Sequence, residues 1–314
     1  MMALAVTSTK EMGREQWLQF RRKGIGGSDA AAIAGLSKWK SPVAVYLEKT
    51  GQAPLEEAQS EAAHFGTILE DVVAQEFSRR TGLKVKRRNA ILQHPDYPFM
   101  LANVDRLIVG ERVGLECKTA SEYLKSEWEG EEIPAPYLLQ CQHYMAVTGY
   151  DAWWIAVLIG GNKFVYKKIE RDEEIIQFLI GLESDFWNNH VVPQVPPMVD
   201  GTEASTELLK KMYPVAVAGS EIHLPSDAEL LITEWEVAKA NLKTAEERVT
   251  ELENRLKALL GENEVGVSRT HVVTWRTVTS ERVDSKRLAK EQPEIYRQYL
   301  KPSVSRRFGI KPTA

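Results

Sequence analysis

Residues 101–119 read LANVDRLIVGERVGLECKT, and this stretch decides the fold. It predicts two short strands, Leu101–Val109 and Arg112–Thr119, with a glycine turn at Gly110 between them. Side chains two residues apart lie on the same face of a strand. Glu116 and Lys118 therefore share one face of the second strand.

The length of the turn sets the register of this hairpin. A two-residue loop centred on Gly110 and Glu111 makes Leu107 face Gly114, and it makes Asp105 face Glu116. Directly opposed side chains lie roughly 4.5–5.5 Å apart at their Cβ atoms. The pattern therefore predicts two carboxylates side by side, with Lys118 next to them.

Two opposed carboxylates repel each other, and a divalent cation between them removes the repulsion. Carboxylate oxygens suit Mg²⁺, which keeps waters that a substrate phosphate can displace. A metal there would polarise a phosphodiester and lower the pKa of an attacking water, and Lys118 could stabilise the developing charge. The same residues also fit an ordinary surface hairpin in which Lys118 bridges two acids.

Upstream, the pattern predicts a helix over Ala62–Thr81. Glu70 falls in line with Val73 and Phe77, beside the face that we expect to be buried. It is a candidate third carboxylate of the site. Glu70 would fit a surface salt bridge equally well.

Nearer the N-terminus, a helix at Glu15–Arg22 is expected to end in the glycine-rich turn GIGGSD, residues 24–29, which opens an Ala-rich helix. Such a turn exposes backbone N–H groups at the positive end of a helix dipole and suits a phosphate. Arg21 would add bidentate bonds to it. The alternative is a tight turn with Ser28 or Asp29 as the N-cap.

Downstream, the chain continues with alternating helices and strands. We expect a helix at Pro136–Thr148, strands at Ala152–Ile159 and Lys163–Ile169, and a helix at Asp172–His190. Trp153, Trp154 and His143 are expected to be structural. Together, these helices and strands predict an α/β fold of the restriction-endonuclease type over residues 1–200, in which helices flank a mixed sheet.

Residues 201–314 are predicted to form a C-terminal extension. Apolar residues recur at steps of four and three from Leu231 to Leu259, which predicts one long helix over about 226–261 with a heptad pattern. A small strand-and-helix tail follows it. The helix could pair between chains, fold back on its own chain or guide DNA. Ala238, Ala245 and Trp235 argue against a regular dimer zipper, and favour packing on its own chain or in an antiparallel pair.

The composition excludes several kinds of site. The net charge is −4 over 314 residues, so any DNA-binding surface has to be local. Two cysteines exclude a four-thiolate zinc or iron–sulfur site. No signal peptide or membrane span is predicted, and we expect a cytoplasmic protein.

Four blocks together resemble the YqaJ-type viral recombinases, relatives of lambda exonuclease in the PD-(D/E)xK nuclease superfamily. They are RRKGIGGSDAAAIAG from Arg21, FGTILE ending at Glu70, Asp105 with Glu116-Cys117-Lys118, and YLLQCQHYMAVTGY from Tyr137. The resemblance covers residues 15–195. Each block is weak alone, but four in order are specific.

The resemblance implies a role for each matching residue. Asp105, Glu116, the Cys117 carbonyl and Glu70 would be metal ligands, and Lys118 the catalytic lysine. Gln140 would lie near the attacking water, and Arg21, Ser28 and Tyr137 would contact DNA or its 5′-phosphate. The implied enzyme is a Mg²⁺-dependent exonuclease, with Mn²⁺ as a substitute, that digests linear duplex DNA from 5′ to 3′ in a phage or prophage recombination pathway. Its expected partners are DNA ends, a single-strand annealing protein and further copies of itself. An endonuclease of the same fold and a non-catalytic DNA-end-binding module are the alternatives.

Overall fold

The structure is a computed structural model that describes residues 3–53 and 60–312. The chain divides into two compact units, Met1–Met212 and Tyr213–Ala314. The division lies later than residue 200, where the prolines of Val191–Val199 suggested a boundary. Helix α7 (Glu203–Met212) belongs to the first unit, since its Ala204 and Ser205 are buried there.

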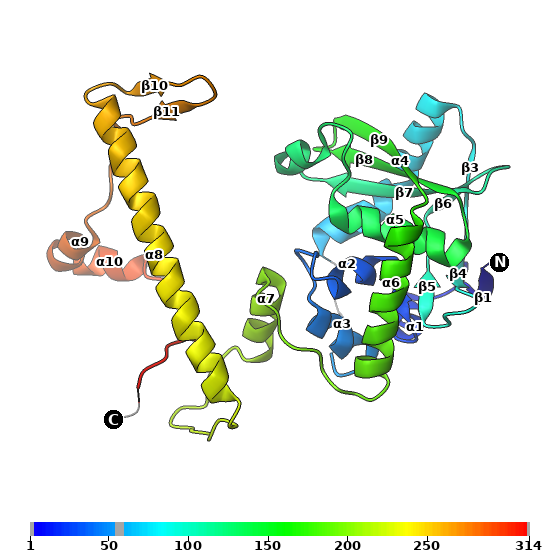
Figure 1. The fold of residues 1–314 in the computed structure, drawn as a ribbon, viewed down its shortest axis with the longest axis horizontal. Helices are drawn as coiled ribbons and strands as arrows, with labels where there is room; N and C mark the ends of the chain where they lie inside the picture. The colour runs from blue at the N-terminus through cyan, green and yellow to red at the C-terminus, as the bar shows by residue number, and fades with distance from the viewer. Residues whose placement is uncertain (1–2, 54–59, 313–314) are drawn as a thin grey trace. The chain divides into compact units, whose positions relative to one another are not determined.

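A five-stranded mixed sheet forms the centre of the first unit (Figure 1). Its strands, in spatial order, are β3 (Val85–Arg87), β6 (Arg106–Ile108), β7 (Val113–Ala120), β8 (Ala152–Ile159) and β9 (Lys163–Glu170). Only β7 and β8 run parallel. Helix α5 (Ala135–Thr148) lies on the crossover between these two strands, because parallel neighbours need a long connection.

Helices cover both faces of this sheet, as expected. On one face, Val73 and Phe77 of α4 (Glu61–Thr81) pack against Leu115 of β7 and Ala156 of β8. On the other face, residues of α5 pack against the alternate positions of β8, including the fully buried Trp153. The sheet therefore separates two apolar layers, and Glu116 and Lys118 lie on the side of α5.

A second, four-stranded sheet corrects the predicted hairpin. Its order is β1 (Leu4–Ser8), β4 (Ala90–Gln93), β5 (Met100–Ala102) and β2 (Ile25–Gly26). The expected continuous strand Leu101–Val109 is in fact β5 and β6, which belong to different sheets. The chain leaves the ladder at residues 103–105, so Asp105 lies at the break where the two sheets meet rather than inside a strand.

The remaining helices of the first unit close its core. They are α1 (Arg14–Arg21), α2 (Gly27–Ile33), α3 (Pro42–Lys49), the 3-10 helix Glu122–Trp128 and α6 (Glu173–Phe186), with a π-helical turn at Trp187–Val191. His143 of α5 is buried, and it contacts Glu183 of α6 and the carbonyl of Leu101, so its role is structural, as expected.

The second unit is built around α8 (Ala228–Leu260), which confirms the single long helix that the heptad pattern predicts. A two-stranded hairpin, β10 (Val265–Val267) and β11 (Val272–Thr274), and the short helices α9 (Ser285–Glu291) and α10 (Pro293–Gln298) complete it. Among the described residues, none of the helices combines the length and apolar composition that crossing a membrane requires.

Candidate active site

The strand register brings the two central carboxylates together as the hairpin predicts. Leu107 pairs with Gly114 and Arg106 with Leu115, which continues to Asp105 opposite Glu116. Asp105 Oδ2 accepts a hydrogen bond of 2.8 Å from the backbone N–H of Cys117. This bond fastens Asp105 to β7 although the residue itself lies outside the ladder.

Glu116 is buried, at 3% exposure, and two polar side chains contact its carboxylate. Its Oε1 lies 2.6 Å from Lys118 Nζ and accepts a bond of 2.7 Å from Gln140 Nε2. The Gln140 amide also donates to the hydroxyl of Tyr144 at 2.8 Å. Glu116 Oε2 is buried too, and has no hydrogen-bond partner within the protein. A buried carboxylate oxygen without a partner is costly, so it marks a place for a cation or a water.

The charges around Asp105 also fit a metal. Burial raises the pKa of Asp105 well above its usual value, and the carboxylates of Glu116 and Glu70 raise it further. A divalent cation would relieve this repulsion. Within residues 3–53 and 60–312, no three His, Cys, Asp or Glu side chains come together closely enough to hold a metal by themselves. Asp105 and Glu116 therefore offer the two-carboxylate type of Mg²⁺ site, which water and substrate oxygens complete.

Within the protein, the partner of the Glu70 carboxylate is an arginine. Glu70 forms an ion pair with Arg106, whose guanidinium is nearly buried, and Arg106 also reaches Asp71 at 2.5 Å. Sequence reasoning left the ion pair open as an alternative for Glu70, and the structure shows it. Glu70 is close enough to influence Asp105, but its carboxylate is directed to Arg106.

Tyr137 lies beside Lys118, whereas the Cys117 side chain packs on the opposite face of β7, against the α4 layer. Burial raises the pKa of the Cys117 thiol, and Asp105 and Glu116 raise it further, so the sulfur stays protonated and only the carbonyl remains a candidate ligand. The Tyr137 ring stacks on Trp128 and lies 5.5 Å from Lys118 Nζ. Tyr137 therefore lies beside Lys118.

One pocket of about 210 Å³ joins the carboxylates to the glycine-rich turn. Asp105, Glu116 and Gln140 line it together with Arg21 and Ser28. Its other lining residues come from α1, the turn, the second sheet, the break after β5, and α5: Trp17, Phe20, Gly24, Gly26, Gly27, Ile91, Leu101, Asn103 and Tyr144. A single ligand can therefore contact the carboxylates and the turn at once.

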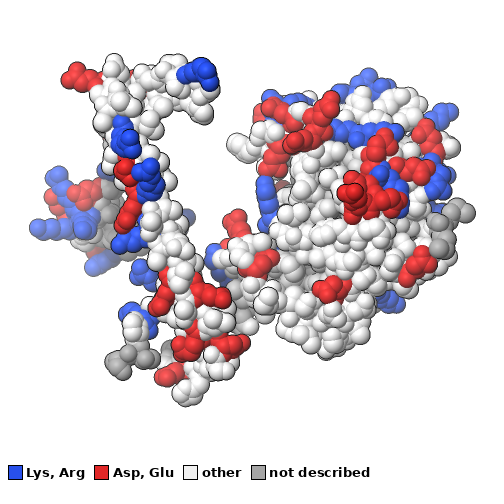
Figure 2. Space-filling view, viewed as in Figure 1, with Lys and Arg blue, Asp and Glu red and all other residues white. Residues whose placement is uncertain are grey.

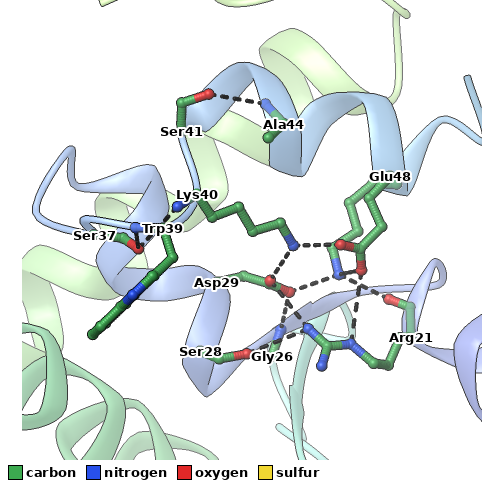
Figure 3. Close-up of polar contacts among 11 residues, drawn as sticks. Arg21, Gly26, Ser28, Asp29, Ser37, Trp39, Lys40, Ser41, Ala44 and Glu48 are labelled. Carbon is green, nitrogen blue, oxygen red and sulfur yellow. Dashed lines mark hydrogen bonds and ion pairs between the residues drawn. The ribbon is translucent and has the colours of Figure 1, made fainter. Parts of the chain in front are cut away.

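Arg21 is held at this pocket by a partly buried ion cluster (Figure 3). Its Nη2 donates to Ser28 Oγ at 3.3 Å and to Asp29 Oδ1 at 3.2 Å. Asp29 is fully buried and also accepts from the Gly26 N–H at 3.1 Å, so one carboxylate shapes the turn and orients the guanidinium. Neither Ser28 nor Asp29 is the N-cap of α2, because that position is Gly26.

Two lysines complete the cluster behind Arg21. Lys40 lies 2.9 Å and Lys49 2.6 Å from the Asp29 carboxylate, and both contact Glu48 of α3. Burial alone would raise the pKa of Asp29, but the charges of Lys40, Lys49 and Arg21 hold it well below its usual value. The five groups carry three positive and two negative charges, which leaves one positive charge beside the pocket.

The protein from Bacillus subtilis (strain 168) called uncharacterized protein YqaJ is 47% identical to this chain over 311 residues, 98% of each chain. A model of the YqaJ-like viral recombinase domain matches residues 16–151. The chain belongs to the YqaJ-like viral recombinase family.

Two solved exonuclease structures match part of this YqaJ-like chain. An alkaline exonuclease from Laribacter hongkongensis is 18% identical, with a TM-score of 0.48, over 64% of this chain and 100% of its own. A phage-related exonuclease from Haemophilus somnus 129PT is 12% identical, with a TM-score of 0.41, over 62% and 99%.

Sequence reasoning missed several residues of the YqaJ-like site. Arg106 follows Asp105 directly, and a basic residue next to a candidate ligand could have suggested a partner for Glu70. Trp17 lies one helical turn before Arg21, and its ring lies 4.9 Å from the guanidinium carbon. Lys40 and Lys49 gave no local signal, since only the packing of α3 on α2 brings them to Asp29.

Proposed function

We propose that this protein is a Mg²⁺-dependent deoxyribonuclease that digests linear duplex DNA from its 5′ ends. The observation that carries the proposal is the shared pocket, which is lined both by the carboxylates of Asp105 and Glu116 and by the anion-binding groups of Arg21 and Ser28. Membership of the viral recombinase family supports it.

The metal would be held by Asp105, by Glu116 through its unpartnered Oε2, and by the Cys117 carbonyl. When bound, Mg²⁺ supplies Lewis-acid activation of the phosphodiester and a more acidic water. Mn²⁺ has similar ligand preferences and would substitute.

Lys118 contributes a fixed positive charge. Burial by itself would lower its pKa, but the carboxylates of Glu116 and Asp105 outweigh burial and raise the pKa above that of a free lysine. Lys118 therefore stays protonated, donates a hydrogen bond to a water or to a phosphate oxygen, and stabilises charge that develops there. Gln140, fixed between Glu116 and Tyr144, keeps the Glu116 carboxylate in place.

The turn defines which end of the DNA is attacked. The N–H groups at the start of α2 and the Arg21 guanidinium form a site for a terminal 5′-phosphate. Seating this phosphate on the turn brings the adjoining part of the strand to Asp105 and Glu116 in the same pocket. Digestion from 5′ to 3′ would leave a 3′ single strand. A single-strand annealing protein in the bacterial cytoplasm, encoded by the same phage or prophage, would then use it.

The first test is a time course with Mg²⁺ on 5′-end-labelled linear duplex DNA and on covalently closed circles. We expect release of label from linear DNA, intact circles, and no cleavage by the Glu116→Gln variant, which keeps the shape of the side chain but loses its charge. Cleavage of circles would establish an endonuclease. Binding of ends without cleavage in Mg²⁺ or Mn²⁺ would establish a non-catalytic end-binding module.

The second test concerns the 5′-phosphate. The wild-type protein should digest 5′-phosphorylated ends faster than 5′-hydroxyl ends, and Arg21→Gln should remove this preference while cleavage persists. Equal rates on both ends in the wild-type protein would contradict the assignment of Arg21 and Ser28, and would leave the assignment of Asp105 and Glu116 intact.

A further inference from the structure

Helix α8 carries a long apolar face that the described residues of its own unit leave uncovered. Leu260 is the one buried residue among its 33 residues, all of which the structure describes. The apolar positions of the heptad pattern, defined here as the α8 seam, are Leu231, Trp235, Ala238, Leu242, Ala245, Val249, Leu252, Leu256 and Leu259. Its seven larger side chains are between 37% and 84% exposed. A helix of this length derives most of its stability from packing such a face, so the seam needs a partner.

The charges beside the seam are complementary to those of a second copy of the same helix. In an antiparallel pair centred between Lys243 and Thr244, Glu234 of one chain lies beside Arg255 of the other, and Lys239 lies beside Glu246. Two-fold symmetry repeats both pairs, which gives four contacts of opposite charge along the edges of the seam. Figure 2 shows Lys, Arg, Asp and Glu side chains along α8, with acidic residues gathered near its N-terminal end.

The volumes of the seam residues select the antiparallel direction. In the register above, Ala238 faces Val249, and Ala245 faces Leu242, so each small side chain meets a larger one. Trp235 then faces Leu252, and Leu231 faces Leu256. A parallel pair in register would instead put Ala238 and Ala245 against their own copies, which leaves voids, and would force two Trp235 indoles into one layer.

We propose that α8 pairs with α8 of a second copy of this chain in an antiparallel coiled coil, and that this contact makes the protein a dimer. The tail of the chain does not occupy the seam: Phe308 contacts Trp235 edge-on at 6.3 Å, but its own side chain is 78% exposed. The proposal does not depend on the nuclease activity, because the seam and the active site belong to different units.

The mass of the full-length protein in solution tests the interface. Sedimentation should give twice the chain mass of 35.4 kDa. Val249→Asp would bury two unpaired charges in the seam and should weaken dimerisation by about 100-fold or more. Thr250→Asp, one residue away on the exposed side, is the matched control and should leave the dimer intact. A monomer in the wild-type protein, or an oligomer that Val249→Asp does not weaken, would overturn the proposal.

Disulfide formation tests the direction and does not rely on a destabilising variant. The antiparallel register places residue 238 next to residue 249 of the second copy, and separates the two copies of residue 238 by eleven residues, about 16 Å. A disulfide requires Cα atoms within about 7 Å. Oxidation should therefore link the double variant Ala238→Cys, Val249→Cys into covalent dimers, and should not link Ala238→Cys alone. Wild type, which has Cys117 and Cys141, gives the background. Dimers from Ala238→Cys alone would establish a parallel pair and refute the proposed direction.

Discussion

Replacing Gly27 by alanine should destabilise the first unit and disturb the active site together. A Cβ atom at Gly27 would lie 2.6 Å from Cε1 of Tyr144 and 3.0 Å from its Cζ, well inside van der Waals contact. Tyr144 is buried, and its hydroxyl accepts the hydrogen bond of Gln140, which in turn holds Glu116. The ring cannot move without shifting this chain of contacts.

The size of the effect follows from the cost of overpacking a well-packed core, about 1–3 kcal/mol. For a unit of this size, each kcal/mol corresponds to about 2–4 °C in melting temperature. Gly26 offers a matched control on the same turn. A Cβ there would meet only Asp29 Oδ2, at an ordinary 3.7 Å. Gly26→Ala should therefore change the free energy of unfolding by less than about 1 kcal/mol, in the stabilising direction.

Urea denaturation followed by tryptophan fluorescence would measure both variants, because six of the eight tryptophans lie in the first unit. A double-mutant cycle with Tyr144→Leu would identify the cause, since removing the ring should recover part of the loss, with a coupling of about 0.5–3 kcal/mol. Equal stabilities of Gly27→Ala and Gly26→Ala, or no coupling to Tyr144→Leu, would refute the reasoning.

Three further predictions follow from the same contacts. The pKa of Asp29 in the folded protein lies below the unfolded value of 3.8. The ionised Asp29 therefore stabilises the folded state fully above about pH 4, and this contribution is lost as the pH falls through the folded-state pKa. Urea titrations between pH 3 and 5 should show a stability loss in the wild-type protein that Asp29→Asn lacks; parallel pH profiles would contradict this. Tyr144→Phe removes one hydrogen-bond acceptor of the Gln140 amide, worth about 1 kcal/mol, and should lower kcat less than tenfold. Gln140→Leu should lower kcat more, because it also removes the bond to Glu116. Steady-state kinetics with the reverse order would show that Gln140 does not act by holding Glu116. Gly114→Ala puts a Cβ 2.2 Å from the buried Trp153 ring and should lower the free energy of unfolding by at least about 2 kcal/mol. Gly181→Ala, in open space within α6, should raise it by about 0.5–1 kcal/mol. Thermal unfolding that ranks the two variants in the opposite order would contradict this packing.

The position of Glu70 on α4 follows from the sequence, but its partner does not. Its place beside Val73 and Phe77 on α4 follows from the helical period, and the structure confirms it. Whether a carboxylate at that place binds a metal or an arginine depends on what the neighbouring strand presents. Arg106 of β6 forms an ion pair with Glu70, and the helical period of α4 does not predict this partner. The role of Glu70 as a metal ligand stays a prediction.

The sequence by itself determined the long helices α4, α5, α6 and α8, the strands β8 and β9, and the register of β6 against β7, because periodicity, alternation and turn length act over a few residues. It thereby determined that Asp105, Glu116 and Lys118 lie together. Only the tertiary structure decided that the strand before Asp105 divides between two sheets, and that α3 brings Lys40 and Lys49 to Asp29. These arrangements arise from contacts between segments far apart in the chain, whose free energies depend on packing and charge pairing that no local pattern records.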